Sequence, residues 1–185
     1  QSLEDAVQPQ YIEVPNAGLC LLIIWLPRLF NMLSLLTEDG SDLKDTEARV
    51  KAIFILQRLV TDEPQEYKEQ ELAFNRILTG CPFQVPLPKT LKLADYEIMT
   101  IESMIIGIKN NCEKFKNISA KGFQLNFIER PGRLEQREDK WVLYVEGRSY
   151  DMLLDFLPWS YRLVQLPWLE KRINVVWRDK GEFDF

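Results

Sequence analysis

The sequence predicts an α+β fold, in which a helical N-terminal two-thirds of about five helices is followed by a small antiparallel β-sheet. Up to residue 130, apolar residues recur at the three- and four-residue spacing of helix faces. After Pro131 and Gly132 the spacing changes to alternation, which is typical of strands. Apolar residues make up 46% of the 185 residues, so the chain can bury a core. Helices and strands that are segregated in this way define the α+β class.

The same patterns predict one domain. We expect a loose polar segment over residues 1–10, a single α+β domain over 11–178, and a frayed tail over 179–185. Within the domain, residues 11–130 form the helical part and residues 131–178 form the sheet part. The first residue is Gln1 and not Met, which suggests a piece of a longer chain.

The helical part opens with a short strand and a helix that contains a proline. Residues 11–14 read as a strand that stops at Pro15, which offers no hydrogen-bond donor. Asn16 is a suitable N-cap, because its side chain can bond to a free backbone N–H. Pro27 should kink the helix or divide it in two. The apolar run over 17–26 has ten residues, whereas a membrane span needs about 20.

Two further helices are predicted over residues 43–61 and 69–79. The first has one broad apolar side. The second ends at Gly80, a residue that tolerates the left-handed conformation common after a helix. Residues 81–88 contain three prolines, so we expect a stiff, extended loop that lies across the core.

A long amphipathic helix is predicted over residues 91–115. Its apolar residues are spaced by three and four in alternation: Leu91, Ala94, Ile98, Ile101, Ile105, Ile108, Cys112 and Phe115. This spacing is typical of a coiled-coil seam between copies of a chain. It is also typical of a helix that packs against its own domain. The run covers barely three heptads, and Met99, Met104 and Ile106 widen the apolar face, which favours the second interpretation. Ile98, Ile101, Ile105 and Ile108 remain the candidate interaction face.

Beyond the long helix, the pattern predicts one more helix and then the sheet. Ser119 is expected to cap a helix that runs to about Phe127. The elements predicted after it are a hairpin of strands 133–138 and 140–146, a short helix over 148–156, and strands over 160–166 and 172–178. Two Leu-Pro-Trp triplets, 157–159 and 166–168, interrupt this region. Each Trp either fills the core where the chain turns or contributes to an interface, since Trp is frequent in both places.

The composition excludes several classes of enzyme. There is no His, which excludes Ser-His-Asp and Cys-His catalysis and removes the commonest metal ligand. No phosphate-binding loop or nucleophile elbow is present. Asp151 and Asp155 lie one helical turn apart, but a carboxylate pair without a nearby His or Cys is a weak catalytic signal. We therefore expect no enzyme activity, no catalytic residue, no cofactor and no metal.

Charge and cysteine content bear on partners and compartment. The formal net charge is −5, the opposite of what a non-specific nucleic-acid binder carries. Three widely spaced cysteines, Cys20, Cys81 and Cys112, form no disulfide framework. Residues 1–15 lack the basic and apolar regions of a signal peptide. We expect the thiols to be reduced, in a cytosolic compartment. We also expect that the chain does not bind nucleic acid and does not span a membrane.

An ordered set of motifs resembles one known family. The motifs lie at residues 14–19, 26–30, 71–72, 75–82, 116–122, 127–134, 150–151, 154, 157–159, 166–168 and 177. Over roughly residues 11–178 this set resembles the tape measure protein family of contractile injection systems, which are phage-tail-like particles of bacteria. The positions that carry the resemblance most clearly are Asn16, Gly18, Leu26, Pro27, Asn75, Gly80, Pro82, Gly132, Pro158, Trp159, Pro167 and Trp168. Departures from the family pattern occur at Asn111, Cys112, Ile118 and Pro131.

The resemblance implies a structural protein that takes part in particle assembly and in setting the length of the inner tube. It implies the bacterial cytoplasm as location, the inner tube, baseplate or spike as partners, and self-association as a further option. An alternative from another class is an adaptor that binds a baseplate, spike or cap component without a role in length. Even as one continuous helix, 185 residues would span only about 280 Å, so this compact piece would be a poor ruler by itself.

Overall fold

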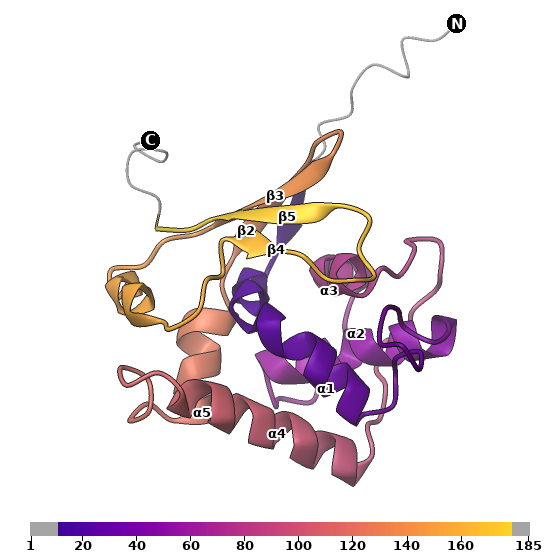
Figure 1. The fold of residues 1–185 in the computed structure, drawn as a ribbon, viewed down its shortest axis with the longest axis horizontal. Coiled ribbons are helices and arrows are strands. Elements are labelled where there is room, and N and C mark those ends of the chain that lie inside the picture. Colours follow the sequence, from indigo (N-terminus) through magenta and orange to yellow (C-terminus); the bar gives the residue numbers. More distant parts are fainter. Residues whose placement is uncertain (1–10, 179–185) are drawn as a thin grey trace, which may run out of the picture.

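A β-sheet covers one side of a layer of helices (Figure 1). The structure is a computed structural model that describes residues 11–178. The predictions for residues 1–10 and 179–185 lie outside the described residues. The strands are β1 (Tyr11–Val14), β2 (Gly132–Gln136), β3 (Lys140–Val145), β4 (Leu163–Val164) and β5 (Arg172–Val176). The α-helices are α1 (Leu26–Met32), α2 (Thr46–Val60), α3 (Ala73–Thr79), α4 (Asp95–Asn110) and α5 (Ala120–Phe123). The tighter or wider helical segments are η2 (Ala17–Trp25), η3 (Glu69–Leu72), η4 (Gln124–Ile128) and η5 (Asp151–Phe156).

The sheet is mixed, so the prediction of an antiparallel sheet is wrong. Its strand order is β1-β2-β3-β5-β4, and β3 pairs with β5 in parallel. A parallel pair needs a long crossover connection, and the segment between β3 and β5, which contains η5 and β4, supplies one. The hairpin of β2 and β3 was predicted correctly. The strand predicted over 160–166 is reduced to Leu163 and Val164 at the sheet edge.

Helices and strands are also less segregated along the chain than predicted. The N-terminal strand β1 pairs with β2, with Val14 opposite Gly132 and Tyr11 opposite Glu135. The hairpin leaves the outer edge of β2 open, and β1 satisfies the backbone groups at that edge. η5 lies between two strands, so the helical elements are not all N-terminal.

The N-terminal apolar segment lies at the centre of the core. All residues from Ala17 to Ile23 are buried in η2, which agrees with its lack of a polar face. Leu26 is buried at the start of α1 and Pro27 occupies its first turn, where a missing N–H costs nothing. Pro27 thus divides the predicted helix in two. Among the described residues, no helix is long and apolar enough to cross a membrane.

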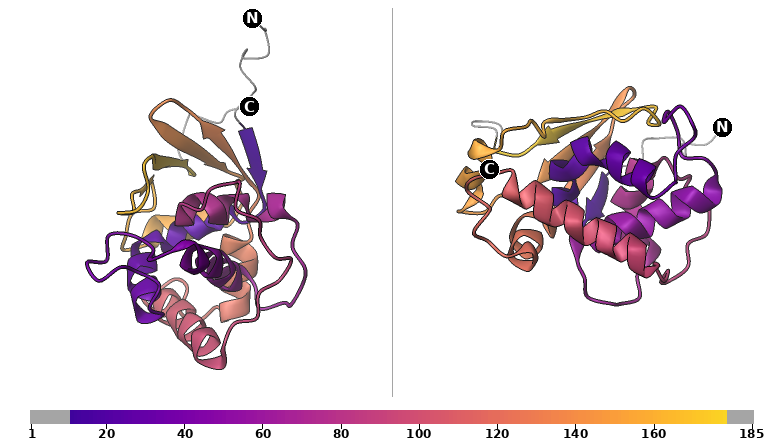
Figure 2. Two further views of the ribbon diagram at one scale, coloured as in Figure 1. Left: turned by 90° about the vertical axis from the view of Figure 1, so that its right-hand side faces the viewer. Right: turned by 60° about the horizontal axis from the view of Figure 1, so that its bottom comes forward.

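The remaining helices begin and end where local chemistry predicts. The carboxylate of Asp45 accepts a bond of 2.7 Å from the backbone N–H of Ala48 at the start of α2. Ser119 accepts one of 2.9 Å from Gly122, as predicted. Gly80 ends α3 with φ of +68°, a left-handed conformation that glycine adopts without strain. α4 lies on the side of the molecule away from the sheet (Figures 1 and 2).

Candidate functional site

Asn16 and Asn75 meet in a buried polar cluster at the centre of the helical layer. The side-chain amide of Asn16 donates to Asn75 Oδ1 at 2.7 Å and to Gln57 Oε1 at 3.2 Å. The amide of Asn75 donates to Gln57 Oε1 at 3.2 Å and to the carbonyl of Ile53 at 3.0 Å. Asn16 therefore joins η2 to α2 and α3. The prediction that its side chain caps a helix is wrong, because this cluster uses the amide instead.

Two glycines mark places where backbones touch. A Cβ on Gly18 would lie 1.8 Å from the backbone oxygen of Phe127, and a Cβ on Gly132 would lie 2.5 Å from the Cβ of Ala17. These contacts bring η2 against η4 and the start of β2, where Ala17 also donates to the carbonyl of Arg130 at 2.8 Å. Only glycine allows so close an approach.

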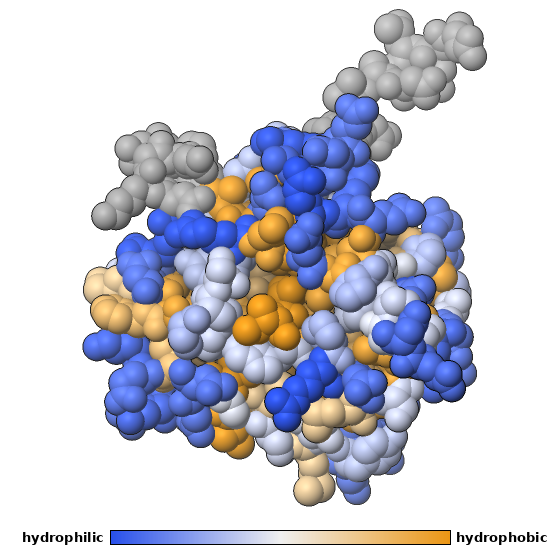
Figure 3. Space-filling view, viewed as in Figure 1, coloured by the Kyte–Doolittle hydropathy of each residue, from blue (hydrophilic) through white to orange (hydrophobic). Residues whose placement is uncertain are grey.

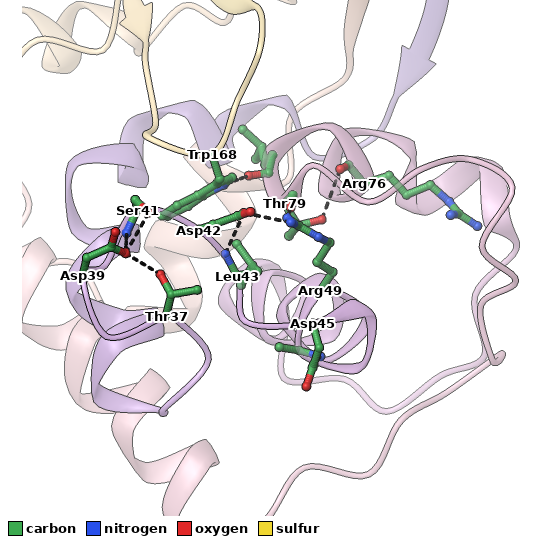
Figure 4. Close-up of polar contacts among 12 residues, drawn as sticks. Thr37, Asp39, Ser41, Asp42, Leu43, Asp45, Arg49, Arg76, Thr79 and Trp168 are labelled. Atoms are coloured by element: carbon green, nitrogen blue, oxygen red, sulfur yellow. Dashed lines mark hydrogen bonds and ion pairs between the residues drawn. The ribbon is translucent and has the colours of Figure 1, made fainter.

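The C-terminus of α3 is held by side chains from two other segments, Arg49 of α2 and Trp168 (Figure 4). The guanidinium of Arg49 donates to the carbonyl of Thr79 at 2.9 Å and pairs with Asp42 at 2.8 Å. Beyond Gly80, the buried Arg76 donates to the carbonyl of Pro82 at 2.6 Å. The bond from Arg49 satisfies a backbone oxygen that the helix end leaves without a partner, and the bond from Arg76 fixes the loop after Gly80.

Both Leu-Pro-Trp triplets fasten C-terminal loops to the N-terminal helices. Trp168 donates from Nε1 to the carbonyl of Leu78 in α3 at 2.8 Å, and Trp159 donates to the carbonyl of Leu21 in η2 at 2.9 Å. The ring of Trp159 also meets Trp25 edge-on, with centroids 4.3 Å apart. Each indole is half-buried, while Pro158 and Pro167 are exposed in the turns. The contacts of both indoles are therefore with the chain's own core.

Sequence reasoning missed a deeply buried ion pair. Arg130 and Asp151 are both buried and form two bonds of 2.7 and 2.8 Å. Asp151 also accepts from the indole of Trp177 at 3.0 Å and from the backbone N–H of Arg148 at 2.8 Å. Burial acts to raise the pKa of Asp151, but these hydrogen bonds outweigh it and hold the pKa below its ordinary value. Asp155 pairs instead with Arg178 at 2.8 Å, so the two carboxylates do not form an acid pair.

A shallow groove of about 530 Å³ separates α1 from α4. Its lining includes Trp25, Arg28 and Met32 on one side and Tyr96, Met99 and Gly107 on the other. Tyr96, Met99 and Met32 expose 61%, 66% and 54% of their surface. Large apolar side chains with that exposure, grouped in one groove, are typical of a surface that binds another protein.

Comparison with known proteins tests the family resemblance that these motif positions carry. The sequence model of one family, contractile injection system tape measure protein, matches residues 1–177. The chain belongs to the contractile injection system tape measure protein family. The resemblance drawn from the ordered motifs is thereby confirmed. No curated protein and no solved structure matches the chain.

Tape measure proteins are structural components of contractile injection systems, and their partners lie within those phage-tail-like particles. The side chains of this tape measure protein agree with a structural role. Burial raises the pKa of the Cys20 thiol far above its ordinary value, and burial also raises that of Cys81, so both thiols are poor nucleophiles. Among residues 11–178, no cluster of three or more Cys, Asp or Glu side chains could hold a metal.

An exposed turn shows that perturbed carboxylates here have structural causes. Asp39 accepts hydrogen bonds from the hydroxyls of Thr37 and Ser41, each at 2.7 Å (Figure 4). These bonds lower its pKa from 3.8 to about 2. The bonds close the turn that links α1 to α2.

The candidate interaction face of α4 lies mostly inside the chain. Ile101, Ile105 and Ile108 are buried, and Ile98 is half-buried. In this conformation another copy could reach only Ile98 among these four residues. The surface that α4 leaves open is the groove with α1, which the spacing of the isoleucines did not indicate. Met99 and Met104, noted only as widening the apolar face, both line this groove and were the signals for it.

Proposed function

We propose that this chain is a non-enzymatic assembly domain of a tape measure protein, which acts in particle assembly and inner-tube length control in the bacterial cytoplasm. The observation that carries the proposal is the role of the motif positions. Asn16, Asn75, Gly18 and Gly132 hold backbones together, and Trp159 and Trp168 fasten loops to helices. Residues used in this way build a rigid body on which other components can assemble.

The shape of the domain limits what it contributes to length. Its longest helix, α4, has 16 residues and extends about 24 Å. A body of this kind cannot measure a tube by its own extent. We therefore propose that residues 11–178 act as one anchoring unit at the inner tube, baseplate or spike, and that any extended ruler is a separate segment of the parent protein.

The proposal is tested by removing the domain from the particle. An in-frame deletion of residues 11–178 should abolish inner tubes or make their lengths irregular, as measured by electron microscopy of purified particles. The full-length protein in which Ile101 and Ile105 are both replaced with Asp, and in which this domain should not fold, serves as a second test. Particles of normal length and composition in both strains would overturn the proposal.

A second candidate function is an adaptor without a role in length, and the apolar groove between α1 and α4 favours it. The adaptor would bind a baseplate, spike or cap component. Under this alternative, the deletion strain should form tubes of normal length that lack one component. Mass spectrometry of the particles, together with the length distribution, separates the two candidates.

A further inference from the structure

α4 has an apolar face that its own chain covers and a second, uncharged face that lines the groove with α1. The first face points into the core through Ile101, Ile105 and Ile108. The second lines the groove with Tyr96, Thr100, Ser103 and Gly107, which recur at the three- to four-residue spacing of a helix-packing face. Figure 3 views the side on which α1 and α4 lie in front, and the surface between these two helices is mixed in hydropathy.

The second face lacks the charge that a solvated helix face normally carries. Among the described residues that line the groove, Arg28 carries the only charge. The acidic residues of α4, Asp95, Glu97 and Glu102, are not in the lining. Glu97 pairs with Lys51 at 3.0 Å and Glu102 with Arg58 at 2.6 Å. Within residues 11–178, no ion pair or hydrogen bond engages the guanidinium of Arg28. An isolated cation in an apolar groove is complementary to an acidic side chain on an otherwise apolar partner.

Gly107 supplies an independent observation. It lies within α4, where glycine is less favourable than alanine by roughly 0.5–1 kcal/mol. A Cβ at this position would meet no atom of the chain within 4 Å, so internal packing does not require glycine. Together with Thr100 and Ser103, it forms a strip of small residues in the groove, beside the larger Tyr96 and Met104. Such a strip allows a second backbone to approach α4 closely.

We propose that the groove between α1 and α4 binds an amphipathic α-helix of another particle component, whose apolar face carries one acidic side chain opposite Arg28. The groove follows the axis of α4, which suits a helix laid alongside. Met32, Met99 and Met104 provide flexible apolar contacts of the kind that helix-binding grooves use. This inference rests on the proposed function, because it takes the partner from within the particle.

A second copy of this chain is a poorer occupant. In a symmetric contact between two such grooves, Arg28 of each copy would face the lining of the other copy's groove. That lining contains no acidic residue, so neither guanidinium would gain a counter-ion. An acidic partner helix would supply one.

The partner is identified by crosslinking in the assembled particle. A photoreactive p-benzoylphenylalanine at Met99 should crosslink to one particle protein, through a helical segment that contains an acidic residue. Arg28→Glu should lower the crosslink yield about tenfold, as expected for a central contact. Replacing the acidic residue of the crosslinked partner segment with Lys should restore the crosslink yield in Arg28→Glu particles. A crosslink to another copy of this chain, no crosslink, or no rescue by the reversed charge would each overturn the inference.

Gly107→Ala separates binding from folding. In the 185-residue chain this variant should raise the thermal midpoint by about 1–4 °C, because alanine favours the helix. In particles it should lower the Met99 crosslink yield, because the added methyl group occupies the strip. Unchanged yield together with raised stability would count against close approach at Gly107 and overturn the helix-packing geometry.

Met99→Glu and Met152→Glu form the matched pair for particle assembly, since both methionines are exposed and only Met99 lines the groove. Met99→Glu should impair incorporation of the crosslinked component, and Met152→Glu should not. If deletion of the domain disrupts particles while Met99→Glu behaves like Met152→Glu, the groove inference fails and the proposed function stands. If the deletion has no effect, the proposed function itself fails.

Discussion

Asp151 shows how one buried carboxylate can join three segments. It receives bonds from Arg130 after η4, from Trp177 after β5, and from the backbone of Arg148. The guanidinium of Arg130 also donates to the carbonyls of Asn126 and Glu146, at 2.6 and 2.8 Å. Desolvating both charges is costly, but these additional hydrogen bonds offset that cost. The pair therefore fixes the position of the C-terminal strand rather than adding net stability by charge alone.

Asp151→Asn should lower the free energy of unfolding by about 3–5 kcal/mol, because it leaves the Arg130 charge buried without a counter-ion. Urea denaturation measures the change. Glu102→Gln is the control, since the pair of Glu102 with Arg58 is partly exposed and should contribute less than about 1 kcal/mol. Equal effects of the two substitutions would contradict the assigned role of Asp151.

The same carboxylate predicts a pH dependence. Its pKa is lower in the folded chain than the ordinary value of 3.8, so folding favours the ionised form. The stabilisation is full at pH values well above 3.8 and is lost as the pH falls through the folded pKa. In urea titrations between pH 6 and acid pH, the wild-type chain should lose stability more steeply than Asp151→Asn below about pH 4. Parallel curves would show that Asp151 does not carry this dependence.

At the scale of elements, local patterns predicted the helices better than the strand pairing. The division of the predicted helix next to Pro27, the helix end at Gly80 and the cap at Ser119 follow from residues within a few positions, and they were predicted correctly. The pairing of β1 with β2 depends on an open edge created by a hairpin at the other end of the chain. No pattern in residues 11–14 alone carries that information.

The candidate site was less predictable than the fold for the same reason. Gly18 has to be glycine because it meets the backbone of Phe127, and Asn16 bonds to Asn75 and Gln57 on distant helices. The preference of Asn for the position just before a helix led to the prediction that Asn16 is an N-cap. The family resemblance marked Asn16, Gly18 and Asn75 as notable, but only the structure shows what they contact.

Each indole bond of the Leu-Pro-Trp triplets should be measurable separately. Trp168→Phe keeps an aromatic ring against Phe30 but removes the donor to Leu78, so it should cost about 1 kcal/mol. Trp141→Phe is the control, because Trp141 is also half-buried and its indole donates to no described residue. Chemical denaturation of both variants gives the difference. A loss for Trp141→Phe as large as that for Trp168→Phe would count against the bond.

The buried face of α4 predicts a strong effect on folding. Replacing both Ile101 and Ile105 with Asp places two unpaired charges where the side chains are 0% and 3% exposed. Each buried charge costs several kcal/mol, and together they approach the total stability of a domain. The variant should be unfolded by circular dichroism. Met99→Asp with Ile106→Asp, on the exposed side of the same helix, should leave it folded. A folded Ile101/Ile105 variant would mean that this face is not core.

The whole molecule should unfold as one unit. The central apolar cluster includes residues from the sheet, from η2 and from α2, α4 and η4, so no group of elements has a separate core of comparable size. Helix content by circular dichroism and the fluorescence of the tryptophans should change with the same midpoint in urea. Two separated transitions would contradict the single domain expected over residues 11–178.

The pairing of β1 with β2 also has a consequence for synthesis on the ribosome. Val14 leaves the ribosome long before Gly132, with which it pairs. At about 5–20 residues per second, the interval is roughly 6–24 s. Throughout that time the apolar segment that becomes η2 has no sheet to cover it. The nascent chain must therefore keep this segment shielded, by a chaperone or by transient contacts, until the later strands emerge and the domain can fold.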